Sequence, residues 1–422
     1  MRDPRFQGRR EPTHLKPRPM RPPTRNARLV LVAGDGGVVG ALPPTPVATP
    51  WWQDIAPVVS AVRERWGIEV TILRLLFASL PAPPGGEVTY LAQIDRAAPA
   101  EPWAGELDDH PLRLAYAKPG GPQADLAWAA ARLAEQGLAM TAPPIQIRTW
   151  NLSSLWRLPC GDGAAWLKVV PPFFAHEGAL LAHLAGRPVP ALLARDGPRT
   201  LLAEIHGEDL YQATPAQHAA MIDLLVDLQY AQAGRVDDLL ALGLQDWRAA
   251  ALTEALAAVV ERVAPELEAA DRASLERFLA GLPARWADLA ACGLPDTLVH
   301  GDFHSGNFRG SDADLTLLDW GDSGVGHPLL DQAAFLDRIP ADDVPPAALR
   351  WAEQWRRRIP GSDPERAARL IVPIAAARQA TIYQGFLDRI EPSEHPYHAA
   401  DPAAWLARAA ALFRRDAEDS PG

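Results

Sequence analysis

The sequence predicts a mixed α+β protein with more than one folding unit. Its 422 residues exceed one ordinary domain, and 48% of them are hydrophobic, which is enough for separate cores. The first half alternates short β-type runs with single helical patterns, whereas the chain from about residue 214 onward is almost entirely helical in pattern. Strands gathered ahead of a helical region are typical of the α+β class.

The first segment, residues 1–27, is rich in arginine and proline, and we expect a disordered basic tail there. It lacks the apolar stretch of a signal peptide. The two cysteines, Cys160 and Cys292, are too few for a disulfide framework or a cysteine metal cluster. Together these features favour a reducing, cytoplasmic setting.

The formal net charge of −11 limits the classes of partner. A strongly acidic chain is a poor match for nucleic acid or for an anionic membrane surface. No apolar run reaches the length of a membrane span. The charge is compatible with a small-molecule substrate, including a cationic one.

Residues 28–140 predict a small α/β or α+β accessory domain. The pattern is strand, helix, strand, strand and helix, over residues 27–34, 51–67, 68–78, 87–94 and 124–137. The first helix is expected to stop at Gly67.

A second unit is expected to begin near residue 142. Three β-type runs cover residues 145–150, 154–160 and 164–170, followed by a helix at 173–186 and a strand at 199–205. The helical region that follows includes the patterns 236–247 and 252–282.

The segment 298–322, LVHGDFHSGNFRGSDADLTLLDWGD, carries the chemistry-bearing residues. Asp302 precedes Asn307 by five residues, and Asp319 follows the apolar run LTLL. Phosphoryl transfer needs a carboxylate that orients the attacking hydroxyl and accepts its proton, and oxygen ligands for Mg²⁺. Asp302 suits the first role, and Asn307 and Asp319 suit the second. A lone aspartate in such a loop could instead be a turn former or a helix N-cap.

The same segment resembles the aminoglycoside phosphotransferase/choline kinase family, through the pattern H-G-D-x-H-x-x-N, a later D-W and a G-x-P-x-x-D-x-A continuation. The matching residues are His300, Gly301, Asp302, His304, Asn307, Asp319, Trp320, Gly326, Pro328 and Asp331. Protein kinases share the spacing, but they have arginine where this chain has Gly301 and phenylalanine where it has Trp320.

The resemblance implies a bilobal protein-kinase-like fold that uses ATP and Mg²⁺. Its small β-rich lobe would cover residues 142–213 and its helical lobe residues 214–415. Lys168, on an apolar strand, would contact the α- and β-phosphates, and Glu177 on the next helix would pair with it.

The remaining nucleotide contacts follow from the same resemblance. Glu204 and Ile205 would form the hinge that offers backbone groups to adenine. The loop NLSS contains no glycine, so Ser153 and Ser154 would offer hydroxyl and N–H donors to the phosphates instead.

Several polar residues have simpler interpretations. His300 and His304 are expected to support the loop, and Asp331 to cap a helix, with Asp322 as another local hydrogen-bonding residue. His176 and His183 lie seven residues apart on one helical pattern and are expected at the surface.

The helix of the accessory domain faintly resembles that of a Nudix domain, in APVVSAVRERWGIEV. Only Glu64 falls on a metal-binding position of that family, while Arg65, Ser60 and Trp52 occupy others. Metal-dependent hydrolysis is therefore not expected there, even on a degenerate Nudix-like fold.

The sequence thus predicts an ATP- and Mg²⁺-dependent phosphotransferase that acts on a hydroxyl of an aminoglycoside, amino alcohol or sugar. The alternative is a catalytically silent nucleotide-binding or regulatory protein on the same fold. The loop without glycine and the extra domain motivate the alternative, and the set Lys168, Asp302, Asn307 and Asp319 argues against it.

Overall fold

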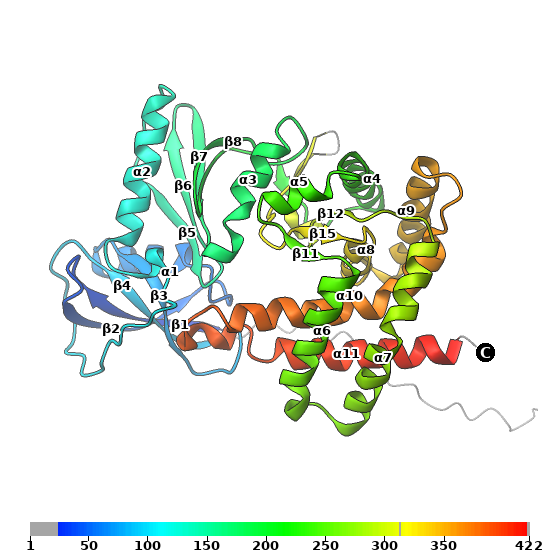
Figure 1. Cartoon of the computed structure of the whole chain (residues 1–422). Helices are drawn as coiled ribbons and strands as arrows, with labels where there is room; N and C mark the ends of the chain where they lie inside the picture. Colours follow the sequence, from blue (N-terminus) through cyan, green and yellow to red (C-terminus); the bar gives the residue numbers. More distant parts are fainter. Residues whose placement is uncertain (1–23, 312–313, 420–422) are drawn as a thin grey trace, which may run out of the picture.

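The computed structural model describes residues 24–311 and 314–419. It is a mixed α+β protein with a four-stranded sheet, then a five-stranded sheet, then a helical region (Figure 1). Most of the expected tail lies outside the described residues, but the first strand already begins at Arg25. No helix of the described part is long and apolar enough to cross a membrane.

The N-terminal unit is built on one mixed sheet in the order β2-β1-β4-β3. Its elements are β1 (Arg25–Val32), β2 (Val38–Val47), α1 (Ala56–Trp66), β3 (Thr71–Ala78) and β4 (Gly86–Gln93). β1 runs parallel to β4 and antiparallel to β2. α1 covers one face of the sheet and ends at Gly67, as predicted, in a left-handed conformation with φ 67°.

β2 was not predicted from the sequence. It contains three prolines, Pro43, Pro44 and Pro46, which cannot donate ladder hydrogen bonds. The strand is nevertheless possible because β2 lies at the edge of the sheet, where, among the described residues, β1 is its only partner strand and a single bridge joins Ala41 to Glu101.

The second sheet is antiparallel and has the order β5-β6-β7-β9-β8. Its strands are β5 (Ile145–Trp150), β6 (Ser153–Cys160), β7 (Gly163–Val169), β8 (Leu192–Asp196) and β9 (Arg199–Ala203). The helix α3 (His176–His183) follows β7 and is shorter than predicted, because a 3₁₀ turn, Pro172–Phe174, precedes it. β8 was missed.

The helix α2 (Gly121–Glu135) packs on this second sheet. Its buried Ala129 and Leu133 share a core with Trp156, Leu167 and other residues of the five-stranded sheet. The sequence predicts α2 within the first unit, whereas α2 shares a core with strands of the second sheet as well as with Tyr116 and Ala117.

The helical region has one extended core. Its helices are α4 (Pro215–Gln232), α5 (Val236–Ala241), α6 (Ala249–Val263), α7 (Ala269–Ala291), α8 (Leu330–Leu336), α9 (Val344–Arg358), α10 (Pro364–Leu387) and α11 (Asp401–Asp419). The predicted helix 236–247 is only partly helical, because its end forms the strand β11 (Gln245–Trp247). The pattern 252–282 divides between α6 and α7.

Short strands hold the polar segment within this helical region. β12 (Thr297–Val299) and β15 (Gly324–Gly326) pair in one small sheet with β11. β13 (Phe308–Gly310) and β14 (Leu315–Leu317) pair in another with β10 (Glu208–Asp209). The loops between these strands carry the predicted site residues.

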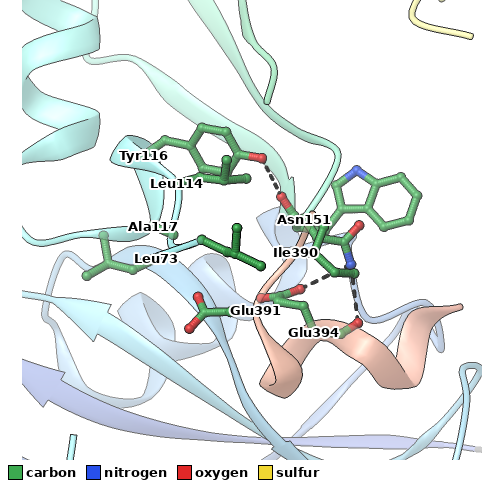
Figure 2. A pocket seen from close by; sticks show the side chains of 10 residues that line it. Leu73, Leu114, Tyr116, Ala117, Asn151, Ile390, Glu391 and Glu394 are labelled. Carbon is green, nitrogen blue, oxygen red and sulfur yellow. Dashed lines mark hydrogen bonds between the residues drawn. The ribbon is translucent and has the colours of Figure 1, made fainter. Parts of the chain in front are cut away.

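The N-terminal unit contacts both of the other parts. Beside β5, the main chains of Ile55 and Ile147 are joined by a hydrogen bond of 3.2 Å. Toward the helical region, the N–H of Leu75 in β3 donates to Glu394 Oε1 at 2.9 Å. Glu394 belongs to the 3₁₀ segment Pro392–Tyr397, which follows α10 and lies against the first sheet (Figures 1 and 2).

Candidate active site

The loop that begins at His300 is anchored by Asp331. The N–H groups of His300 and Gly301 each donate to the Asp331 carboxylate at 2.8 Å, and Gln229 donates to it at 3.0 Å. The predicted capping role of Asp331 is therefore wrong. The residue lies inside α8, whose N-terminus has no side-chain cap, and its carboxylate instead satisfies backbone donors of a distant loop.

Gly301 is required by the path of this loop. Its φ is +92°, and a Cβ atom there would lie 2.0 Å from the carbonyl oxygen of Asp322. The main chains of the two polar loops therefore touch, which brings Asp302 close to the segment that holds Asp319.

The two histidines support the loop, as predicted. His300 is fully buried, its Nε2 donates to the carbonyl of Leu318 at 2.8 Å, and burial lowers its pKa to about 4. His304 Nδ1 accepts from the N–H of Gly306 at 3.0 Å and so caps the short turn Ser305–Asn307.

Asp302 is surrounded by donors. Arg338 Nη1 donates to its Oδ1 at 2.8 Å, Asn307 Nδ2 donates to its Oδ2 at 3.2 Å, and His304 Nε2 lies 3.4 Å from Oδ2. Burial would raise the pKa of Asp302, but the contact with His304 and the charge of Arg338 outweigh it and hold the pKa well below its usual range. Asp302 is therefore an ionised carboxylate.

Lys168 contacts carboxylates from two distant parts of the chain. Its Nζ lies 2.7 Å from Glu177 Oε1 and 2.7 Å from Asp319 Oδ1. Desolvation alone would lower the pKa of Lys168, but the two carboxylates outweigh it and raise the pKa above its ordinary value. Glu177 is buried, accepts a further bond from the N–H of Trp320 at 3.1 Å, and has a pKa that burial raises.

Asp319 has an unusual backbone conformation. Its φ of 59° makes it the one non-glycine residue with positive φ among the described residues. Such a conformation costs about 1–3 kcal/mol and persists where surrounding contacts impose it, often at functional sites. Partial desolvation in the cleft opposes ionisation of Asp319, yet the charge of Lys168 lowers its pKa.

The donor set at this point fits Mg²⁺. The amide nitrogen of Asn307 is used by the carbonyl of Asp302 at 2.9 Å and by its carboxylate, so the amide oxygen is the atom left for a cation. Asp319 adds a half-exposed carboxylate. Carboxylate and amide oxygens are the ligands that Mg²⁺ prefers.

A cleft of about 290 Å³ contains these groups. Lys168, Asp302 and Asp319 line it, together with two residues that the sequence did not single out for a role in the site, Asp322 and Arg338. Burial and the neighbouring charges of Asp302 and Asp319 raise the pKa of Asp322 to about 8. Asp322 could have been predicted as a site residue, because it lies three residues after Asp319. Arg338 follows α8 in a loop without a recognisable motif, so the sequence offered no reason to select it.

The two serines predicted to contact phosphate differ in position. Ser153 lines the cleft, and its hydroxyl accepts from Trp150 Nε1 at 3.1 Å. Ser154 is buried, and its hydroxyl accepts from Trp156 Nε1 at 3.0 Å on the face that packs against α2. Because successive side chains of a strand point to opposite faces, the Ser154 hydroxyl is directed away from the cleft, contrary to the prediction for it, and the phosphate contact of the Ser154 N–H stays a prediction.

The predicted hinge follows β9 directly. Glu204 Oε1 accepts from Arg157 at 3.2 Å, and the carbonyl of Ile205 accepts from Arg309 Nε at 2.8 Å. One of the backbone groups predicted to bind adenine is thus paired within the protein, and the hinge role of both residues stays a prediction.

Of the two helix histidines, His176 is not a surface residue, contrary to the prediction, and His183 is partly exposed. His176 is buried, and burial lowers its pKa to about 4. His183 Nε2 lies 2.8 Å from Gln232 Oε1 of α4. The apolar surroundings of α3 explain both positions, because the helix is enclosed between the second sheet and the helical core.

Comparison with known proteins adds a family and a fold. The model of the phosphotransferase enzyme family (APH) matches residues 156–370, just over half of the 422 residues. The comparison with curated proteins found no match.

Among solved structures, a candidate aminoglycoside phosphotransferase from Ralstonia eutropha is 16% identical, with a TM-score of 0.53 over 71% of this chain and 99% of that one. The macrolide 2′-phosphotransferase MphH from Brachybacterium faecium is 20% identical, with a TM-score of 0.46 over 65% and 97%. An ethanolamine kinase from Plasmodium vivax is 10% identical, with a TM-score of 0.48 over 67% and 85%. The first of these likenesses supports the protein-kinase-like fold.

Proposed function

The chain belongs to the phosphotransferase enzyme family, and from this premise we propose that it transfers a phosphoryl group from ATP, with Mg²⁺, to a hydroxyl of a small molecule. The acceptor classes proposed are aminoglycosides, amino alcohols and sugars. One observation carries the proposal. Lys168 contacts Asp319, which is 151 residues away, in the cleft that also contains Asp302.

In this proposal, Asp302 orients the acceptor hydroxyl and receives its proton as the phosphoryl group is transferred. Its low pKa keeps it ionised, so it is ready to accept a hydrogen bond from the hydroxyl. Arg338 now donates to Asp302 Oδ1, and an incoming hydroxyl would share or replace that contact.

Lys168 would bind the nucleotide phosphates, with Glu177 holding the amine in position. The buried carboxylate of Glu177 stabilises the cation where desolvation would otherwise be costly. Asn307 and Asp319 would hold Mg²⁺, which neutralises charge on the transferring group when it is bound.

The test is a measurement of acceptor-dependent ADP release by the full chain, with MgATP and a panel of amino sugars, amino alcohols and neutral sugars. We expect turnover with at least one acceptor and a loss of at least about 100-fold in kcat for Asp302→Asn. Asp196→Asn, at an exposed position of β8, is the matched control and should keep full activity. Turnover that survives Asp302→Asn would contradict the assignment.

A catalytically silent nucleotide-binding protein is the second candidate. Two observations favour it. The loop before β6 has no glycine, and the Ser154 hydroxyl faces away from the cleft. Its signature would be a rise in melting temperature with MgATP and no ADP release with any acceptor of the panel.

A further inference from the structure

The N-terminal unit reaches into the cleft. Trp51 and Gln53, from the loop before α1, and Pro83, from the loop before β4, line the same cleft as Lys168, Asp302 and Asp319. Neither Glu204 nor Ile205, the predicted adenine-binding residues, lines this cleft. The N-terminal unit therefore shares a cleft with the proposed phosphotransfer residues and not with the residues predicted to bind adenine.

The loop that carries Trp51 and Gln53 is fixed by hydrogen bonds to buried side chains. The fully buried Arg25 donates to the carbonyls of Trp51 at 2.5 Å, Trp52 at 3.1 Å and Asp54 at 2.7 Å. Trp52 is itself fully buried, and its Nε1 donates to the carbonyl of Gly85 at 2.7 Å. The loop thus has a built conformation that directs one tryptophan inward and leaves the other exposed.

The loop is also tied to the sheet that carries Lys168. The N–H of Thr149 in β5 donates to the carbonyl of Gln53 at 3.2 Å, and Arg148 lies 3.3 Å from Asp54 Oδ1. Trp51 and Gln53 therefore keep a defined position relative to the proposed phosphotransfer residues.

Aromatic side chains from other parts of the chain line the cleft with Trp51. Trp150 lies 5.7 Å from the ring of His398, which in turn lies 5.7 Å from Tyr383 and 5.4 Å from Phe386. Trp51 is 47% exposed, although a tryptophan is usually more deeply buried. An exposed indole in a cleft that other aromatic rings also line offers a flat apolar surface to a ligand.

We propose, as an extension of the function proposed above, that the N-terminal unit forms part of the acceptor site and selects alcohols that carry a ring. The indole of Trp51 would pack on the ring face, and the amide of Gln53 would bond to a polar substituent. Compact alcohols without a ring would make neither contact. This assigns the N-terminal unit a role in acceptor specificity.

The test is isothermal titration of the full chain, with Mg²⁺ and a non-hydrolysable ATP analogue, using glucosamine and kanamycin as ring-bearing probes and ethanolamine as the compact probe. We expect Trp51→Ala to weaken binding of a ring-bearing probe about tenfold and Trp51→Phe to restore most of it. Ethanolamine binding should be unchanged. Because the Trp51 side chain is half exposed, the variant should keep the melting temperature of the wild type.

The matched control is Phe77→Ala, which removes an aromatic ring that is 61% exposed on β3 of the same unit but outside the cleft. It should bind all three probes as the wild type does. Equal affinities of wild type and Trp51→Ala for the ring-bearing probes would overturn the proposal, as would ring-bearing probes that bind no more tightly than ethanolamine. Failure of the phosphotransferase function would appear separately, as an absence of ADP release whatever the affinities.

Discussion

The contacts of Lys168 show why the role of a single residue could be predicted from the sequence. A lysine on an apolar strand needs a compensating charge, because desolvation of an unpaired ammonium is costly. Glu177 lies nine residues further along, and the two are 2.7 Å apart. The resemblance to the phosphotransferase family implied this partner, and one 3₁₀ turn connects β7 to the start of α3, which carries Glu177.

Asp331 shows the opposite case at the same scale. Because Asp331 lies at the start of a helical pattern, a helix cap was its simplest interpretation. The Asp331 carboxylate instead accepts from two buried N–H groups about thirty positions earlier in the chain. Nothing in the local sequence distinguishes these two uses of an aspartate at the start of a helix.

Asp331→Ala should therefore destabilise the protein by about 3 kcal/mol, because it leaves buried N–H donors of His300 and Gly301 without a partner. Urea denaturation of the variant and the wild type measures the difference. Asp342→Ala, at an exposed position before α9, is the control and should change stability by less than about 0.5 kcal/mol. A loss no greater than that of the control would refute the anchoring role.

At the level of elements, capping explains where α4 begins. Thr214 and Gln217 form a reciprocal capping box, in which each side chain accepts from the other residue's N–H, and Pro215 occupies the first helical position. The same residues are visible in the sequence as T-P-A-Q, so this boundary is a local property.

Thr214→Ala should cost about 1 kcal/mol in the free energy of unfolding, since it removes the acceptor for the Gln217 N–H. Thr214→Ser keeps a hydroxyl at that place and should stay within a few tenths of the wild type. Chemical denaturation of the three proteins is the measurement. Equal losses for alanine and serine would show that the cap contributes little.

For the molecule as a whole, the N-terminal unit is joined to the helical region through buried acidic groups. Arg113 pairs with Glu391 at 2.7 Å, and Glu394 accepts from the N–H of Leu75. Asn151 donates to the carbonyl of Glu394 (Figure 2). Burial raises the pKa of Glu394 from its ordinary 4.5 to about 8.

This raised pKa predicts a pH dependence of stability. Between pH 4.5 and about 8, the folded state keeps the Glu394 proton that the unfolded state loses, so the free energy of unfolding falls as pH rises through this window. Glu394→Gln cannot ionise and should be more stable than the wild type at pH 8. The advantage should shrink as the pH is lowered toward 4.5. A difference between the two proteins that does not vary with pH would contradict this interpretation.

The sequence by itself determined the α+β character of the chain and the helix end at Gly67. It also singled out Lys168, Glu177, Asp302, Asn307 and Asp319, which the structure brings into and beside one cleft. The fold class and the helix end depend on local chemistry, namely hydrophobic period and capping. The loop residues Asp302, Asn307 and Asp319 depend on the spacing of polar groups, whereas Lys168 and Glu177 were implied by the resemblance to the family.

Only the tertiary structure decided the edge strand β2 and the packing of α2 on the second sheet. It also decided that the Ser154 hydroxyl faces away from the cleft and that Trp51 and Arg338 line it. Each of these depends on contacts between segments distant in sequence. The energy of such contacts comes from burial against a particular neighbour, and a linear pattern does not record which neighbour that is.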